Sequence, residues 1–337
     1  MKSVLVILVI YLGIFLYGNS LPNPFAGEKE EDDKLIFKNN SLPVYRNDGR
    51  KLAQLDCQDL ITNYRSFTAN RLKMHIYAFP DKEEKSLEAK TLNQKFKSPN
   101  EDIFLDADLA EFINTNEPIS FKKNVKMTYG KTTYLETEIC QWTQKSEIIF
   151  FPEELTLQSG NNLIKGETAT FESKNKNVRI EKNIISFFEL AEHKSGKYSP
   201  KKDNLTKLTS VGPLIYDNSH RSIKMPNSTS IKNLEFSLSA DKIEFYLNDD
   251  NKIYLLKAEG NVKIILIEKN VVAWSPTVTV DFEDKNYHFM GKNNQSPYIE
   301  MNGYRQTAEY ITYNDITEIL KAGPEVKSVK IIKDSKE

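Results

Sequence analysis

The feature that most constrains this 337-residue sequence is the alternation of apolar and polar side chains in residues 240–266, ADKIEFYLNDDNKIYLLKAEGNVKIIL. A period of two is typical of a β-strand with one buried and one solvated face. Between two alternating segments, the run Asn248–Asn251 predicts a tight turn, because Asn and Asp tolerate left-handed backbone. Gly260 predicts a bulge or corner further on. The stretch therefore predicts three strand segments of one antiparallel sheet.

This unit recurs along the chain. Its signature is an aromatic residue, then a polar turn rich in Asn, Asp, Lys and Ser, then a β-branched or apolar residue. Copies begin at Tyr77, Phe112, Trp142, Phe171, Tyr216, Tyr246, Phe282 and Tyr313. A spacing of about 30 residues indicates a stacked repeat architecture. The interval from Phe171 to Tyr216 is longer by roughly half a repeat, and we expect a linker there.

The other strand candidates are also short and are bounded by Gly, Asn, Lys or Ser. No stretch of helical period competes with them, although 51–63 and 108–114 could each hold a helical turn. We expect strands at 103–109, 125–129, 133–139, 147–151, 155–158, 162–170 and 178–182. Pro276 should lie at a strand start or a bulge, since proline cannot donate to a ladder. The predicted fold class is all-β, with repeated antiparallel hairpins forming a twisted sheet.

Composition divides the chain into six predicted segments. Residues 1–18 hold one Lys and an apolar run too short for a typical bilayer core, which indicates a signal anchor or a cleaved signal peptide and an exported chain. Residues 19–50 are acidic and polar and are predicted as a linker. A first β module is expected at 51–190, a linker at 191–204, a second β module at 205–330 and a tail at 331–337.

The sequence offers no recognisable catalytic or metal-binding motif. Its four His are dispersed, and 46 Lys and Arg against 47 Asp and Glu leave no basic footprint for nucleic acid. Paired carboxylates lie in turns, where they serve turn chemistry and solubility. We therefore predict a non-enzymatic protein without a cofactor or metal. Cys57 and Cys140 are either two small buried hydrophobes, the interpretation we favour, or one disulfide.

The positive feature is a continuous apolar face in both modules. One such face must fold over on itself or meet another sheet. If one seam stays open, the result is an apolar trough able to hold acyl chains; if it closes, the result is an ordinary sandwich core. The pattern alone favours the closed core. The candidate groove-lining residues are the alternating apolar positions Ile103, Leu105, Val125, Met127, Leu135, Ile139, Ile148, Phe150, Leu155, Leu157, Ile243, Phe245, Val262, Ile264, Leu266, Val278, Val280, Phe282, Ile299 and Met301.

Short motifs, in order and spacing, carry a family resemblance over roughly residues 55–325. The second module resembles the LptA/OstA family through Ser239–Ile243, Ala258–Val262, Gly291 and Gln306–Tyr313. The first module resembles the LptC family through Leu105–Asp108, Phe121–Val125, Tyr134–Glu138 with Trp142, and Ile164–Glu167. Lys123 stands where the first motif usually has Gly, and one chain combines both module types.

The resemblance implies a V-shaped β-jellyroll that holds the acyl chains of lipopolysaccharide. It further implies a periplasmic location with an N-terminal inner-membrane anchor. The implied partners are an inner-membrane lipopolysaccharide ABC transporter and other β-jellyroll proteins, including outer-membrane ones, joined edge to edge by β-augmentation. The alternative from a different class is a secreted all-β polysaccharide-binding or polysaccharide-active protein, which would gather carboxylates in a cleft.

Overall fold

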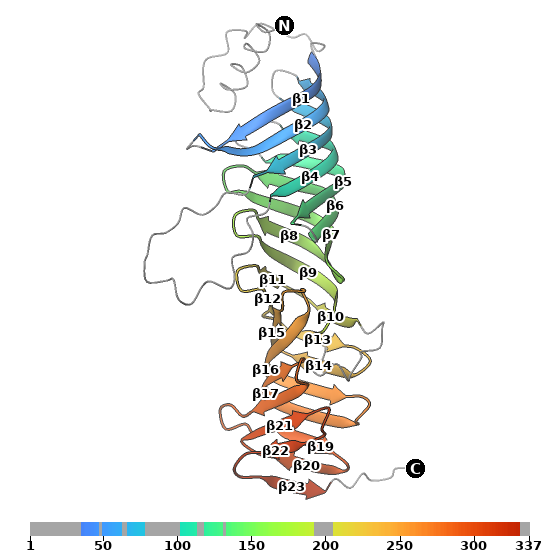
Figure 1. Cartoon of the computed structure of the whole chain (residues 1–337), viewed down its shortest axis with the longest axis vertical. Helices are drawn as coiled ribbons and strands as arrows, with labels where there is room; N and C mark the ends of the chain where they lie inside the picture. Colours follow the sequence, from blue (N-terminus) through green and yellow to red (C-terminus); the bar gives the residue numbers. More distant parts are fainter. Residues whose placement is uncertain are drawn as a thin grey trace.

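The computed structural model describes residues 35–46, 49–62, 66–77, 102–112, 118–130, 133–191 and 205–330. The predicted signal segment 1–18, residues 19–34 and 192–204, and the tail 331–337 lie outside these ranges. The described residues form strands and turns, stacked into one elongated body with β1 at one end and β23 at the other (Figure 1). A search of these ranges finds no helix long and apolar enough to cross a membrane. The predicted all-β, antiparallel fold class is confirmed.

The strands fall into two sets by length. The first nine are long: β1 (Leu35–Tyr45), β2 (Lys51–Thr62), β3 (Phe67–Ile76), β4 (Ile103–Phe112), β5 (Ile119–Tyr129), β6 (Thr133–Thr143), β7 (Ile148–Ser159), β8 (Asn162–Glu172) and β9 (Asn177–Phe188). Most later strands are short: β10 (Thr206–Ser210), β11 (Leu214–Asp217), β12 (Ser222–Met225), β13 (Thr229–Lys232), β14 (Phe236–Ala240), β15 (Lys242–Leu247), β16 (Ile253–Leu266), β17 (Val271–Asp281), β18 (Asn286–Met290), β19 (Tyr298–Met301), β20 (Tyr304–Thr307), β21 (Tyr310–Asn314), β22 (Leu320–Ala322) and β23 (Lys327–Lys330).

A line of bulges folds the sheet over on itself. In β4 to β9 the ladder register shifts near the middle of the strands, for example between Lys122 and Val125 in β5. In β4, β6 and β8 the buried positions shift by one residue at the bend. In β5, β7 and β9 three residues that are not buried form the bend, and the buried positions keep the same alternation on both sides of it. In every case both halves of the strand bury side chains on the same inner side. Lys123 and Asn124 adopt φ values of 65° and 51° at this bend. The strand halves therefore stack into two arms that face each other.

The two arms can be followed through the whole ladder. Arm A contains the strand halves that stack in line with Ile103–Asp106, and arm B contains those in line with Leu109–Phe112. After β9 the arms separate into short strands. Arm A continues through β10, β13, β14, β19, β20 and β23. Arm B continues through β11, β12, β15, β18, β21 and β22, while β16 and β17 span both arms.

Side chains from opposite arms pack into the core. Phe188, in arm A of β9, lies 6.2 Å by ring centroid from Phe245, in arm B of β15. Phe236 of arm A meets Phe282, at the arm B end of β17, at 5.8 Å. Because aromatic pairs at this spacing bury large apolar areas, they stabilise the packing of the two inner faces against each other.

Residues 240–266 form strands as the alternation predicts. A single strand, β16, continues through the corner predicted at Gly260. Asn248 closes the turn between β15 and β16 by accepting bonds from the backbone of Asp250 and Lys252. Gly260 lies at a bulge within the continuous strand β16, with a φ of 76°, and a Cβ there would lie 2.4 Å from Asp241 Oδ2. Pro276 lies opposite this bulge, as expected for a residue without a backbone donor.

Three segment predictions need correction. The polar linker predicted for 19–50 contains strand β1, which pairs with β2 over nearly its full length because Phe37, Leu42 and Val44 supply apolar side chains. No helical turn forms in the described parts of 51–63 and 108–114, which are residues 51–62 and 108–112, because ladder pairing prevails there. The two strands expected at 147–151 and 155–158 are one strand, β7, bent at its bulge.

The ladder also crosses the predicted boundary between modules. The second half of β9 pairs with β10, and its first half pairs with β11. Backbone hydrogen bonds thus connect residues 51–190 to residues 205–330 without a break in either arm.

Candidate functional site: an apolar interior between two arms

Most of the predicted lining positions point into the space between the arms. They are buried at 8% exposure or less: Ile103, Leu105, Val125, Met127, Leu135, Leu155, Leu157, Ile243, Phe245, Val262, Ile264, Leu266, Val278, Val280, Phe282 and Ile299. Met301 is half-buried and packs against the same core. Because these side chains are almost fully buried, much of the interior between the arms is closed core. Free space remains in only part of it.

The inner face expected for three of the residues was wrong. Ile139, Ile148 and Phe150 are only half-buried, and their neighbours Cys140, Ile149 and Phe151 are fully buried instead. In β6 the bulge between Thr137 and Gln141 moves the buried positions from Leu135 and Thr137 to Cys140 and Trp142, so an alternation continued straight through it selects Ile139 on the opposite face. In β7 the buried positions Ile149, Phe151, Leu155 and Leu157 keep one alternation through the bend. Ile148 and Phe150 belong to a run of four apolar residues, 148–151, in which alternation does not distinguish the two faces.

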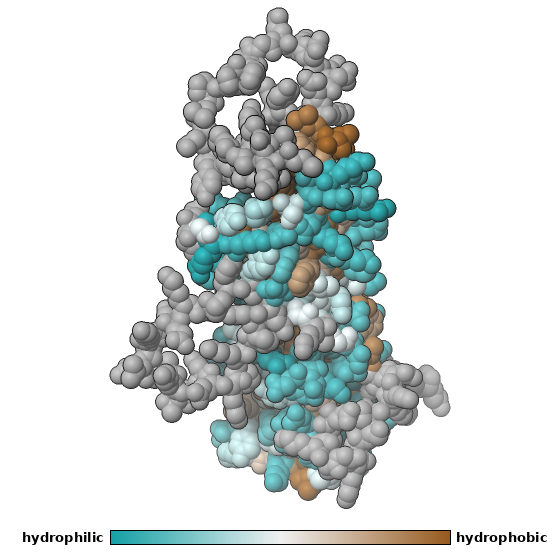
Figure 2. All heavy atoms as spheres, turned by 45° about the horizontal axis from the view of Figure 1, so that its top comes forward, coloured by the Kyte–Doolittle hydropathy of each residue, from teal (hydrophilic) through white to brown (hydrophobic). Residues whose placement is uncertain are grey.

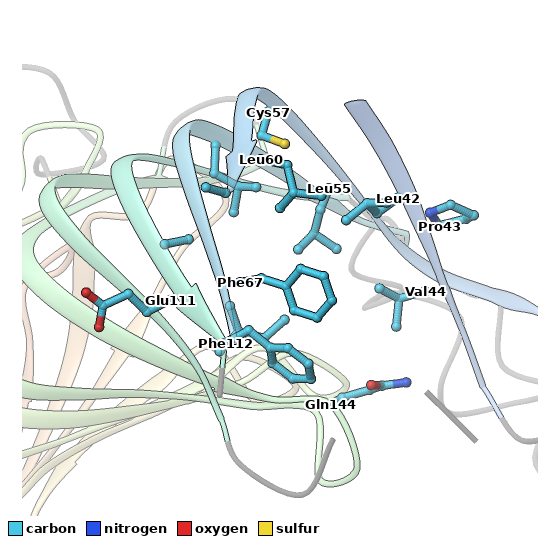
Figure 3. Close-up of a pocket in the computed structure, with 14 residues that line it drawn as sticks. Leu42, Pro43, Val44, Leu55, Cys57, Leu60, Phe67, Glu111, Phe112 and Gln144 are labelled. Atoms are coloured by element: carbon cyan, nitrogen blue, oxygen red, sulfur yellow. The ribbon is translucent and has the colours of Figure 1, made fainter. Parts of the chain in front are cut away.

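The first free space lies at the N-terminal end of the interior. This N-terminal pocket encloses about 730 Å³ outside protein atoms, part of it open to solvent. Phe67 and Phe112 meet inside it with ring centroids 5.9 Å apart, facing Val44 and Gln144, while Glu111 points away from them (Figure 3). The lining is almost wholly apolar and comes from both arms: Leu42, Pro43, Val44, Leu55, Cys57, Leu60, Phe67, Ala69, Leu72, Ala110, Glu111, Phe112, Ile119 and Gln144.

A second space lies where the two predicted modules meet. This central pocket, of about 750 Å³ by the same measure, is lined by arm A of β5 to β9 and by arm B of β8 to β15. Met127, Leu135 and Leu157 are the predicted candidates that line it. Trp142, Ile149 and Phe151, all 0% exposed, occupy arm B between the two pockets. These side chains therefore separate the N-terminal pocket from the central pocket.

The open side of the folded sheet is bridged near the N-terminal pocket. The N-terminal tie joins the arm A end of β1 to the arm B turn between β6 and β7. Arg46 Nη2 lies 2.7 Å from Glu147 Oε2, and Gln144 Nε2 donates to the Tyr45 carbonyl at 3.3 Å. Both bonds of this tie are made by side chains.

A middle tie closes the seam beside the central pocket. Residues 189–191, which continue arm A beyond β9, form a parallel bridge with Ile253 of arm B. Ile253 N donates to the Glu189 carbonyl at 2.9 Å, and Ala191 N donates to the Ile253 carbonyl at 2.7 Å. The buried Asn162 reinforces the bridge, since Nδ2 donates to the Asn251 carbonyl at 2.6 Å and Oδ1 accepts from Glu189 N at 3.0 Å.

A C-terminal tie is ionic. Lys285 of arm B lies 3.1 Å from Glu235 of arm A, with side chains 8% and 18% exposed. Lys269 of arm A pairs in the same way with Glu318 of arm B. The backbone N–H of Asp315 donates to the Lys285 carbonyl, and burial raises the pKa of the Asp315 carboxyl. The seam is thus bridged at three levels.

The cysteines are separate buried thiols. Cys57 lines the N-terminal pocket and Cys140 lies in the inner face of β6, and both are free. Burial raises the pKa of each thiol, so both remain protonated at neutral pH. Within the described ranges no cluster of three or more His, Cys, Asp or Glu side chains could hold a metal ion.

The lining of the N-terminal pocket was missed by the sequence prediction. The candidates began at Ile103, whereas β1, β2 and β3 supply most of this pocket. The alternation Leu72, Met74 and Ile76 was a usable signal for β3. No comparable signal existed for Arg46 and Glu147, which are 101 residues apart in sequence.

Comparison with known proteins finds similarity among solved structures only. No protein-family model matches the chain, and no curated protein matches it. Among solved structures, the chain is similar to LptH of Pseudomonas aeruginosa, described as the LptA-homologous periplasmic component of the conserved lipopolysaccharide transport device. The alignment has 10% identity and a TM-score of 0.33, and covers 37% of this chain and 93% of LptH.

Proposed function

We propose that this chain is a non-enzymatic lipopolysaccharide-transport protein of the periplasm, which holds acyl chains between its two arms. Its ladder would form part of a bridge from an inner-membrane extractor to the outer membrane. The observation that carries the proposal is the N-terminal pocket, an apolar space lined by both arms of one folded sheet.

The pocket suits an acyl chain in its chemistry. Its lining is almost wholly apolar and comes from both arms, as is typical of sites for apolar ligands. Each buried CH₂ contributes about 0.8 kcal/mol, so a chain of a dozen carbons could gain roughly 10 kcal/mol before entropy costs. The polar side chains among the lining residues are Glu111 and Gln144.

The terminal edges of the sheet suit end-to-end joining. Among the described strands, β1 pairs on one side with β2, which leaves its other edge available for another strand. Leu35 and Ile36 are exposed there, and Figure 2 shows a hydrophobic patch at this end of the chain. The ordered motifs that resemble the LptC and LptA/OstA families point to the same kind of assembly. The apolar segment 1–18 would supply the inner-membrane anchor.

Photocrosslinking in cells tests the proposal. The photoreactive residue p-benzoylphenylalanine would replace Phe112, which lines the pocket, or Phe104, which is exposed on the outer face of the same strand. In a lipopolysaccharide-producing bacterium we expect a lipopolysaccharide adduct at position 112 and none at position 104. Equal labelling at both positions, or none at 112 with the variant protein folded and exported, would contradict the proposal.

The polysaccharide alternative gains no support from the described interior. Its buried polar residues are Ser, Thr, Asn and one Lys, without a buried Asp or Glu among the described residues. A cleft that acts on sugars would bring two carboxylates together.

A further inference from the structure

We infer that the N-terminal tie is a latch, and that it must open before an acyl chain can enter or leave the N-terminal pocket from the side. The inference rests on the proposed function and adds the residues that control loading. They are Arg46 and Glu147, with Gln144 as a secondary contact.

The latch lies directly over the pocket. Gln144 bonds to the Tyr45 carbonyl across the seam and also lines the pocket, as does Val44, next to Tyr45 in β1. Figure 3 shows Val44 and Gln144 on the same side of the space that Phe67 and Phe112 fill. An acyl chain that enters through this part of the seam, with its headgroup in solvent, would pass between Arg46 and Glu147 to reach these rings.

The chemistry of this tie allows it to open. The middle tie includes backbone bonds between Glu189, Ala191 and Ile253, so opening it would break part of the ladder. The bonds of the N-terminal tie are made by the side chains of Arg46, Glu147 and Gln144, and the first two are still partly exposed, at 24% and 21%. A charge-assisted bond of this type is favourable but weakens as salt screens it. Of the two ties beside the pockets, the N-terminal one is therefore the one that can open without breaking the ladder.

The backbone around Arg46 and Glu147 also favours a functional latch over an incidental surface ion pair. Arg46 lies in the β1–β2 turn, where its backbone N–H donates to the Arg50 carbonyl and its carbonyl accepts from Gly49. Glu147 has a φ of 56° and its carbonyl accepts bonds from Ser173 N and Oγ. Both partners thus project from turns that their own local bonds hold in place.

The kinetics of lipid uptake by the full chain test the latch. The probe is cis-parinaric acid, a fluorescent fatty acid that brightens in an apolar site, mixed with protein in a stopped-flow instrument. Arg46→Ala and Glu147→Gln should each speed uptake and release by about fivefold, the change expected for losing one such pair. Wild-type uptake should accelerate with added salt, and that of Glu147→Gln should not.

Two further variants make the result specific. The swap Arg46→Glu with Glu147→Arg should restore slow uptake, which also separates the latch from simple loss of folding. Lys126→Ala, which breaks an exposed pair with Glu136 inside one arm, should leave the rate unchanged.

The outcomes separate the latch from the proposed function. Rates equal to wild type in both single variants, or equal acceleration in Lys126→Ala, would overturn the latch while leaving lipid binding intact. Absence of probe binding by the wild-type chain would instead overturn the proposed function, and the latch with it.

Discussion

At the scale of single residues, the fold depends on bends at which residues with a Cβ adopt left-handed backbone. Lys123 and Asn124 both lie in the left-handed region at the bend of β5. Left-handed backbone costs a residue with a Cβ about 1–2 kcal/mol. Lys123 stands where the LptC-like motif usually has Gly, and the bulge forms with Lys in that place. The ladder on both sides of the bend therefore outweighs the local strain.

Lys123→Gly should stabilise the protein. Relief of the strain exceeds the entropy cost of Gly by roughly 0.5 kcal/mol, so the urea midpoint should rise slightly. Ser120→Gly, in the same strand with ordinary backbone, should lower the midpoint by a similar amount. A lower midpoint for Lys123→Gly would mean that the lysine side chain contributes something that the strain argument omits.

At the scale of elements, β16 is the strand that links the arms. Its first half pairs with β15 and its second half with β14, and the Gly260 bulge lies between the two halves. Ile264 lies on the inner face between Leu238 and Ala273, while Ile265 is half-buried on the opposite face. The loss of folding stability caused by a charged residue in β16 should therefore depend on which face of the strand the residue occupies.

Ile264→Asp should cost more than about 4 kcal/mol, because it places an unpaired charge in the core. Ile265→Asp should cost about 1–2 kcal/mol, mainly through lost partial burial and strand preference. Thermal unfolding of the pair measures the difference. Similar melting temperatures for the two variants would mean that the inner and outer faces of β16 are assigned wrongly.

At the scale of the whole molecule, the arms are held together by ties between residues distant in sequence. Asn162 and Asn251 are 89 positions apart, yet their bond seals the seam where the two predicted modules meet. The folded sheet thus forms a closed interior with free space at two levels, and its terminal edges lie at opposite ends (Figure 1).

Asn162→Ala should destabilise the protein by about 1–3 kcal/mol, since it leaves two partly buried backbone groups of the middle tie, Asn251 O and Glu189 N, without this partner. Asn161→Ala is the matched control, because Asn161 is exposed and donates only to the Glu189 carboxylate, and it should cost less than about 1 kcal/mol. Urea unfolding followed by tryptophan fluorescence compares them. An equal loss in both variants would place the strength of the tie in its backbone bridge alone.

The strand content and most of the inner face could be predicted from the sequence. Ile103, Leu105 and Val125 are buried as expected, because alternation reports which side of a strand faces the core. The prediction failed at Ile139, where a bulge shifts the alternation of β6 without a glycine to mark it. It also failed at Ile148 and Phe150, because four consecutive apolar residues at 148–151 do not show which face is buried. It also missed strand β1, whose apolar residues are spaced irregularly around Asn39 and Asn40.

By itself the sequence determined that the chain forms an antiparallel all-β ladder, because period-two alternation and turn residues act over a few neighbouring positions. The tertiary structure decided which parts of the apolar face close into core and which remain open as pockets. It also decided that Arg46 meets Glu147 and that Asn162 meets Asn251. These contacts depend on how far the bulges bend each strand and on how the twist accumulates over many strands. A local sequence pattern does not encode this accumulated geometry.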